Sequence, residues 1–270
     1  MRGEAPMAPM ALQKPGPVLK VVLMSLFGIW LLFALALNWG GVASDSFFWL
    51  TGNTERLAAG ELWRLLTASL LHMPKETIGH ILSSMIGLYF LGASLEEAFG
   101  SARFARFLLL AAVLSYGTQF LVLLALGPEI SSRLAPDHYF GAMPVVEAVA
   151  IAWACSFKGQ TVRLFFVVPV SSTGLIIFVV GMSLMYLIAG ATPPSGHIAL
   201  FAGMGWGFVL GGSSPSPLRR FYLRFRLARL EAEAQSENRA RRNKARQSRL
   251  RVIEGGKDPK DDKNGKRMLH

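Results

Sequence analysis

The sequence predicts an all-α protein that crosses a membrane several times. Of its 270 residues, 52% are hydrophobic and 17% are charged, whereas roughly a quarter of the residues in soluble domains are charged. Apolar stretches recur along the chain, and each approaches the length needed to cross about 30 Å of hydrocarbon. There are six of them: 18–38, 77–95, 104–126, 140–157, 164–190 and 196–212. We therefore predict a polytopic bundle of six transmembrane helices.

The first apolar stretch is interpreted as a retained anchor helix. At about 20 residues it is longer than the apolar part of a signal peptide, and no clear small-x-small cleavage site stands out before Trp39. We divide the chain into a cytoplasmic N-terminal segment (1–17), a six-helix membrane domain (18–212) and a basic cytoplasmic tail (213–270).

Positive charge is concentrated in that tail. Residues 213–270 contain 17 Lys and Arg against 7 Asp and Glu, a net charge of +10 out of +11 for the whole chain. Other cations flank the apolar stretches: Arg2, Lys14, Lys20, Arg103, Arg106, Lys158 and Arg163. With six spans these cations all lie on one side, and the positive-inside rule makes that side the cytoplasm. Both termini are predicted to be cytoplasmic.

The tail itself has two parts. Apolar and Arg residues alternate at helical spacing in "PLRRFYLRFRLARLEAEA", residues 217–234, a pattern typical of an amphipathic helix on an anionic leaflet. From Gly255 the composition is that of a disordered end. Two alternatives stay open, a solvated charge run that only fixes topology and contact with RNA, although no nucleic-acid partner is expected.

The first loop, from Gly40 to about Glu76, is amphipathic rather than polar. Leucines recur at helical spacing around the Trp63–Arg64 pair. Because Trp and Arg favour the membrane interface, short interfacial helices are predicted there, with this pair as an anchor.

Four motifs follow one another in a set order: "ELWRLLTASLLH" in the first loop, "HILSSMIGLYFLGASLEEAFGSARF" in the second stretch, "GAMP" at the head of the fourth and "SGHIALFAG" in the sixth. In order and spacing they resemble the rhomboid superfamily of intramembrane serine proteases, over about residues 47–212. The resemblance implies a rhomboid-like six-helix bundle with an interfacial first loop.

An active rhomboid has a serine in a G-x-S-G motif at the start of its fourth span and a histidine in its sixth. A serine needs a base to become a nucleophile, and an oxyanion hole must stabilise the charge that develops. The resemblance places His197 on the histidine but Met143 on the serine, and a thioether cannot be deprotonated to attack a carbonyl. The catalytic dyad is therefore predicted to be lost.

Other positions depart from the family pattern in the same direction. His80 matches a histidine of the second span, but Ser84 replaces the asparagine that donates to the oxyanion. Pro144 replaces the second glycine of the motif and has no N–H to donate, and Leu200 replaces a small residue.

We predict a catalytically inactive member of the superfamily that is similar to the derlins and other inactive rhomboids and binds membrane-protein clients. The alternative is an active rhomboid-family intramembrane serine endopeptidase that cleaves single-span substrates with an unrecognised nucleophile. A transporter is disfavoured because the spans show no inverted repeat. No metal or cofactor is expected.

Glu147 raises a separate question, because an ionisable residue within a span is costly and usually has a partner. It lies one turn after Met143 on the same helical face. We predict that Glu147 and His197 form a hydrogen-bonded pair between the fourth and sixth spans. The alternatives are that Glu147 reaches water in the cavity, or that it joins His80 and His197 around a metal.

Overall fold

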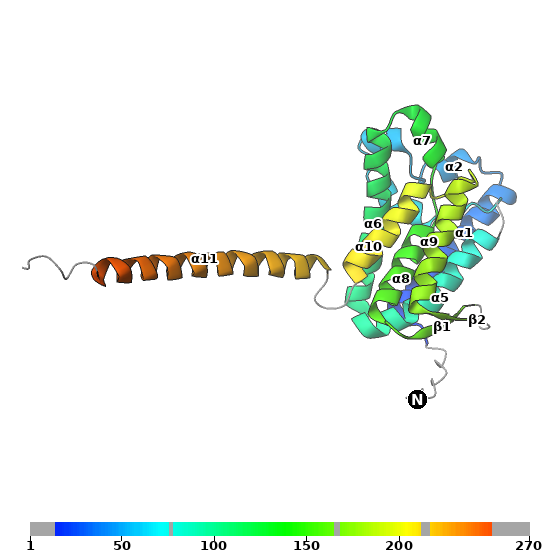
Figure 1. The fold of residues 1–270 in the computed structure, drawn as a ribbon. Coiled ribbons are helices and arrows are strands. Elements are labelled where there is room, and N and C mark those ends of the chain that lie inside the picture. The colour runs from blue at the N-terminus through cyan, green and yellow to red at the C-terminus, as the bar shows by residue number, and fades with distance from the viewer. Residues whose placement is uncertain (1–13, 76–77, 165–167, 212–216, 250–270) are drawn as a thin grey trace, which may run out of the picture. The chain divides into compact units, whose positions relative to one another are not determined.

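A computed structural model describes residues 14–75, 78–164, 168–211 and 217–249 (Figure 1). The chain is mostly helical and divides into two compact units, Met1–Pro217 and Leu218–His270. The first unit contains the helices α1 (Pro17–Asn38), α2 (Asp45–Phe48), α3 (Thr54–Ala58), α4 (Arg64–Thr67), η1 (a 3₁₀ turn, Ala68–Leu70), α5 (Gly79–Phe99), α6 (Ser101–Ala125), α7 (Pro128–Leu134), α8 (Met143–Ser156), α9 (Ser172–Ile188) and α10 (His197–Gly211), with the strands β1 (Thr161–Leu164) and β2 (Val168–Ser171).

Each of the six predicted stretches coincides largely with one apolar helix, of 14 residues in α8 to 25 in α6, and the first loop contains the predicted short helices α2 to α4. The predicted start of the fifth stretch was wrong, because α9 begins at Ser172 and the antiparallel strands β1 and β2 precede it. Thr161 pairs with Ser171 and Leu164 with Val168, and the valines of the two strands favour the extended conformation. Ser171 ends β2 and caps α9, because its hydroxyl accepts a hydrogen bond from the Gly174 amide at 3.0 Å.

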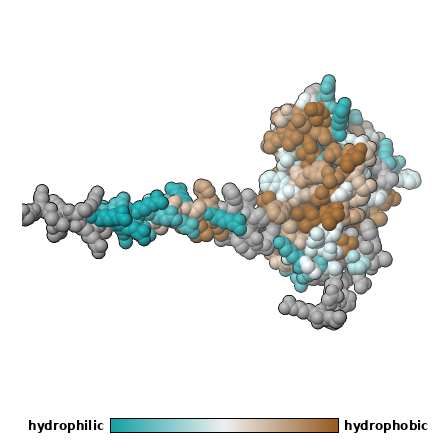
Figure 2. Space-filling model, viewed as in Figure 1, coloured by the Kyte–Doolittle hydropathy of each residue, from teal (hydrophilic) through white to brown (hydrophobic). Residues whose placement is uncertain are grey.

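Among the described residues, two helices are both long and apolar enough to cross a membrane, α1 and α6. The helices α8, α9 and α10 are apolar but shorter. Large apolar side chains are exposed along α1 and α9, and Figure 2 shows apolar residues gathered on one face of the helical unit. Such contiguous apolar surface is typical of a protein that contacts lipid.

Helix α8 is the centre of the first unit. It packs against α5, α6, α9 and α10, and every residue from Pro144 to Ala154 is buried. A helix surrounded in this way needs apolar residues on all its faces, which explains the unbroken apolar sequence of the fourth stretch.

Contact between α8 and α10 depends on three glycines spaced one turn apart. A Cβ added to Gly203 would collide with the carbonyl of Pro144, one at Gly207 with the carbonyl of Ala148, and one at Gly211 with the side chain of Ala152. Backbones approach this closely only where side chains are absent, as at small-residue interfaces between membrane helices.

Two polar side chains fix the ends of neighbouring helices. The Gln119 side chain on α6 accepts a hydrogen bond from the Ala199 amide at 2.9 Å, in the first turn of α10. The Glu96 carboxylate on α5 accepts hydrogen bonds from the amides of Val18 at 3.0 Å and Leu19 at 2.9 Å, in the first turn of α1. Acceptors at these positions satisfy amides that have no partner within the helix.

The described part of the tail is one helix, α11 (Pro217–Arg249), which extends beyond the predicted amphipathic segment. Tyr222 and Phe225 are exposed on it. The predicted disordered end from Gly255, and the predicted N-terminal segment up to residue 13, lie outside the described residues.

The glycine contacts predict a position-specific loss of stability. Gly207→Ala should lower the free energy of unfolding by about 1 to 3 kcal/mol, because the new methyl group must displace the α8 backbone. Gly205→Ala is the matched control on the same helix, since a Cβ at Gly205 has nothing within 4 Å, and it should change stability by much less. Thermal unfolding in detergent measures both. Equal effects at the two positions would contradict the proposed packing constraint.

Candidate functional site

The segment that leads into α8 is held by hydrogen bonds from three directions. The Tyr139 backbone exchanges two hydrogen bonds, of 2.8 and 2.9 Å, with Gly52 in the first loop. The Phe140 amide donates to the Pro194 carbonyl at 2.9 Å. The Gly141 amide donates to the Ala68 carbonyl, and its own carbonyl accepts from the Tyr116 hydroxyl at 2.7 Å. The head of α8 is therefore fixed against the first loop, α6 and the loop before α10.

Gly141 is required at this point of the chain. Its φ angle of 116° lies in the region that favours glycine, and a Cβ there would lie 2.8 Å from Cε1 of His80. The first glycine of the resembled motif is thus retained for backbone reasons, and Met143 follows as the first residue of α8.

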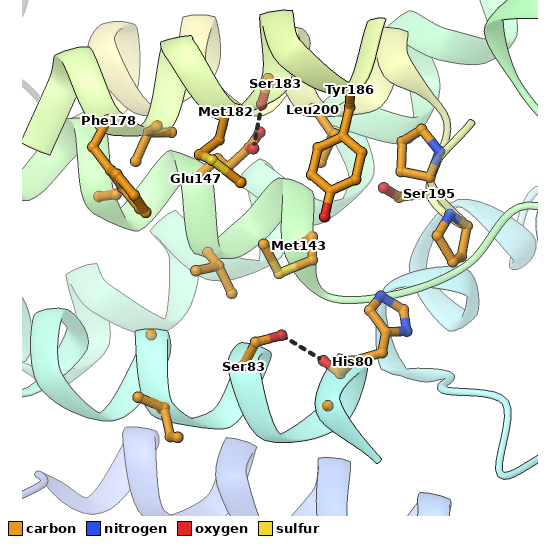
Figure 3. A pocket seen from close by; sticks show the side chains of 18 of the residues that line it. His80, Ser83, Met143, Glu147, Phe178, Met182, Ser183, Tyr186, Ser195 and Leu200 are labelled. Atoms are coloured by element: carbon orange, nitrogen blue, oxygen red, sulfur yellow. Dashed lines mark hydrogen bonds between the residues drawn. The ribbon is translucent and has the colours of Figure 1, made fainter. Parts of the chain in front are cut away.

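A cavity of about 590 Å³ lies beside the head of α8, between α5 and α9. Figure 3 shows Met143 and Glu147 on one wall, with His80 and Ser83 from α5 opposite. Helix α9 contributes apolar residues and Ser183, and the loop before α10 contributes Ser195. The lining is mainly apolar, including Phe178, Val179, Met182, Leu175, Phe90 and Val146.

The remnant positions predicted from the sequence do not all meet in this cavity. Met143, His80 and Leu200 line it, but His197 and Ser84 are not among the described residues that do. His197 is the first residue of α10 and is only 2% exposed, and its Nδ1 atom has no hydrogen-bond partner among the described residues.

The predicted hydrogen bond between Glu147 and His197 is absent. Glu147 Oε1 instead accepts a hydrogen bond from the Ser183 hydroxyl on α9 at 2.8 Å, and Glu147 Oε2 has no partner among the described residues. The cause is the α8–α10 contact, which uses the face of Pro144, Ala148 and Ala152. Glu147 lies on a different face of α8, which borders the cavity and α9.

Ser84 forms a contact that the sequence reasoning missed. It is fully buried, donates to the His80 carbonyl at 3.0 Å, and lies 3.2 Å from Nε2 of His72. Burial, together with the adjacent His80, lowers the pKa of His72 to about 3. An imidazole with so low a pKa is a weak base, and neither residue lines the cavity. This serine–histidine contact therefore lacks the basicity and the access that a catalytic dyad needs.

The two residues of the Trp63–Arg64 pair have different environments. Trp63 is exposed, as an interfacial anchor should be, and its ring lies 5.9 Å from that of Trp49. Arg64 is buried inside the first loop, where it donates to the carbonyls of Phe48 and Thr51 at 2.9 and 2.7 Å. It also forms a 2.6 Å ion pair with Glu61. Arg64 therefore stabilises the loop from within, and of this pair only Trp63 is exposed as an anchor would be.

Comparison with known proteins agrees with this fold. Residues 59–213 match the Rhomboid domain family, which is more than half of the chain. The protein belongs to the rhomboid family and is a membrane protein.

Among curated proteins, the chain is similar to RHOMBOID-like protein 12, mitochondrial, of Arabidopsis thaliana. The two are 29% identical over 170 residues, which cover 58% of this chain and 49% of the relative. The matched region therefore spans about half the length of that relative.

The buried His72 predicts acid sensitivity. In the unfolded chain His72 binds a proton near its ordinary pKa of 6.5, but in the folded protein its pKa is about 3. Folding stability should therefore fall as the pH is lowered from about 6.5 toward 3, with a limiting slope of about 1.4 kcal/mol per pH unit from this one group. In His72→Gln the dependence of the unfolding free energy on pH should become shallower, by an amount that corresponds to about one proton. Denaturant unfolding in detergent between pH 7 and 4 measures it. Ser84→Ala retains His72 and should retain the slope; an unchanged slope in His72→Gln would refute the assignment.

Proposed function

We propose that this protein is a catalytically inactive rhomboid-like membrane protein that binds transmembrane segments of client proteins. The observation that carries the proposal is Met143. It lies at the head of α8, inside the cavity and at the position of the motif serine. A thioether has no proton to lose and forms no acyl-enzyme, so hydrolysis through this position is chemically excluded.

The surroundings of Met143 support the same conclusion. Pro144 has no amide N–H for a developing oxyanion. The Ser84 hydroxyl donates to the His80 carbonyl and does not line the cavity. Of the two oxyanion-hole donors that the resemblance implies, the one at Pro144 is thus missing, and the one at Ser84 is directed at the His80 carbonyl.

Client binding is supported by the shape and lining of the cavity. The two helices that flank it, α5 and α9, both pack against α8, and among the described residues neither packs extensively against the other. Large apolar side chains are also exposed on both helices, among them Leu82 on α5 and Ile177 on α9, and Ile78 is exposed just before α5. A client helix in the bilayer can therefore reach the cavity laterally, between α5 and α9, while its apolar surface stays in contact with lipid or with apolar side chains.

We also propose six spans with both termini in the cytoplasm. The apolar helix found in each predicted stretch supports the count, and the cations at the starts of α1 and α6 and after α8 support the orientation. Helix α8 has 14 residues, about 21 Å at 1.5 Å per residue, and tolerates this length because protein surrounds it. Reporter fusions at the two ends of the chain test the orientation.

Restoring the serine alone should not restore proteolysis. In Met143→Ser the hydroxyl returns, but Pro144 and Ser84 still provide no donor, and each missing donor costs roughly 100- to 1,000-fold in rate. We expect no cleavage of a generic single-span substrate in proteoliposomes and no labelling by an alkyl fluorophosphonate, for both the natural chain and this variant. Labelling of the natural chain that one Ser→Ala change abolishes would instead establish an active endopeptidase with another nucleophile.

Client binding predicts where a bound helix can be cross-linked. A photoreactive benzoylphenylalanine at Phe178 lines the cavity, whereas one at Leu109 on α6 lies outside it, and the two natural side chains are equally exposed at 49%. With a synthetic single-span peptide in proteoliposomes, cross-linking at Phe178 should exceed that at Leu109 several-fold. Equal cross-linking yields at the two positions would mean that the peptide meets the protein at random in the bilayer, and would contradict the client-binding proposal.

A further inference from the structure

The strongest unexplained feature of the molecule is the environment of Glu147. Its side chain is only 6% exposed, and it lies on a cavity wall among apolar residues of α8 and α9 (Figure 3). The Ser183 hydroxyl satisfies Oε1, and Oε2 is buried without a partner. Removing a carboxyl oxygen from water without a compensating hydrogen bond is costly, so such groups normally have a partner.

The missing partner has to come from the cavity side. Among the described residues that line the cavity, Glu147 is the only Asp or Glu, and none is Lys or Arg. Ser183 donates its one hydroxyl hydrogen to Oε1. The cavity is also lined by the polar residues His80, Ser83, Tyr186, Thr192 and Ser195. None of them forms a hydrogen bond with Glu147 Oε2, which has no partner among the described residues.

We propose that Glu147 is a specificity-determining residue for clients, and that it binds a basic side chain carried within a client's transmembrane helix. This inference rests on the proposed function, because it requires that a client helix occupies the cavity between α5 and α9. The apolar lining accepts the hydrophobic surface of such a helix, and the carboxylate pairs with a Lys or Arg that would be costly to leave alone in hydrocarbon.

The chemistry favours a basic side chain over other polar ones. A Lys or Arg supplies both the hydrogen-bond donor that Oε2 lacks and the charge that neutralises the carboxylate, and charge-assisted hydrogen bonds are roughly twice as strong as neutral ones. A client acid would repel Glu147, and a fully apolar helix would leave Oε2 unpaired. Selection therefore acts through one residue in an otherwise nonspecific apolar cavity.

The test uses the full-length protein in proteoliposomes and three synthetic Leu-Ala single-span peptides that differ only in the central residue, Lys, Leu or Glu. Binding is measured by titrated cross-linking to the photoreactive residue at Phe178. The natural Glu147 background should bind the Lys peptide at least tenfold more tightly than the Leu peptide, and the Glu peptide most weakly. Equal affinity for the Lys and Leu peptides in this background overturns the inference and needs no variant that could misfold.

Variants then assign the preference to Glu147. Glu147→Gln keeps the shape of the side chain and should lose the preference for the Lys peptide, and Glu147→Lys should reverse it toward the Glu peptide. Ser183→Ala removes the hydrogen bond to Oε1 but keeps the carboxylate, so it should retain the preference. A preference for Lys that persists in Glu147→Gln would overturn the assignment. If no peptide is captured above the Leu109 level, the proposed function fails; capture of all three without preference defeats only this inference.

Discussion

The close contact between the backbones of α8 and α10 is the constraint on which the rest of the structure depends. Gly203, Gly207 and Gly211 bring α10 against the carbonyls and small side chains of α8, so the two helices cannot rotate relative to each other without collision. The contact determines which face of α8 is covered by α10 and which faces are left for α5, α6 and α9. The direction in which each polar side chain of α8 points follows from it.

This constraint explains which parts of the structure could be predicted from the sequence. Apolar runs interrupted by glycine, proline and charge predicted where the long helices lie, because burial from water or in lipid requires apolar surface whatever the packing. The strands β1 and β2 were missed because an apolar run next to a helix has no periodicity that separates strand from helix. Helix α7 was missed because it is short and half polar.

The candidate site was predicted only in part, for a related reason. Sequence spacing correctly placed Met143 and Glu147 on one side of α8, and both line the cavity. It could not say which neighbouring helix that side faces, so the pairing of Glu147 with His197 was wrong. A usable signal was present: Pro144, Ala148 and Ala152 repeat at four-residue spacing, as do the glycines of α10, and two such stripes favour mutual contact. The buried position of Arg64 was not predicted for another reason. Its carbonyl partners, Phe48 and Thr51, belong to the first loop, whose geometry does not follow from any sequence periodicity.

The positions that depart from the rhomboid motif are those where the fold and the chemistry make different demands. The first turn of a helix has amides without intrahelical partners, so proline is well tolerated there. Pro144 therefore leaves α8 intact, and its carbonyl packs closely against Gly203. Catalysis at this position would nevertheless lack a backbone N–H donor. In the same way, Met143 packs against the apolar core, although a thioether cannot serve as a nucleophile that loses a proton. Helix packing depends on backbone contact and apolar surface, whereas hydrolysis depends on a few polar atoms at set positions. A chain can therefore lose the polar atoms and keep an apolar cavity between two helices, and in this protein Glu147 gives that cavity a new polar group.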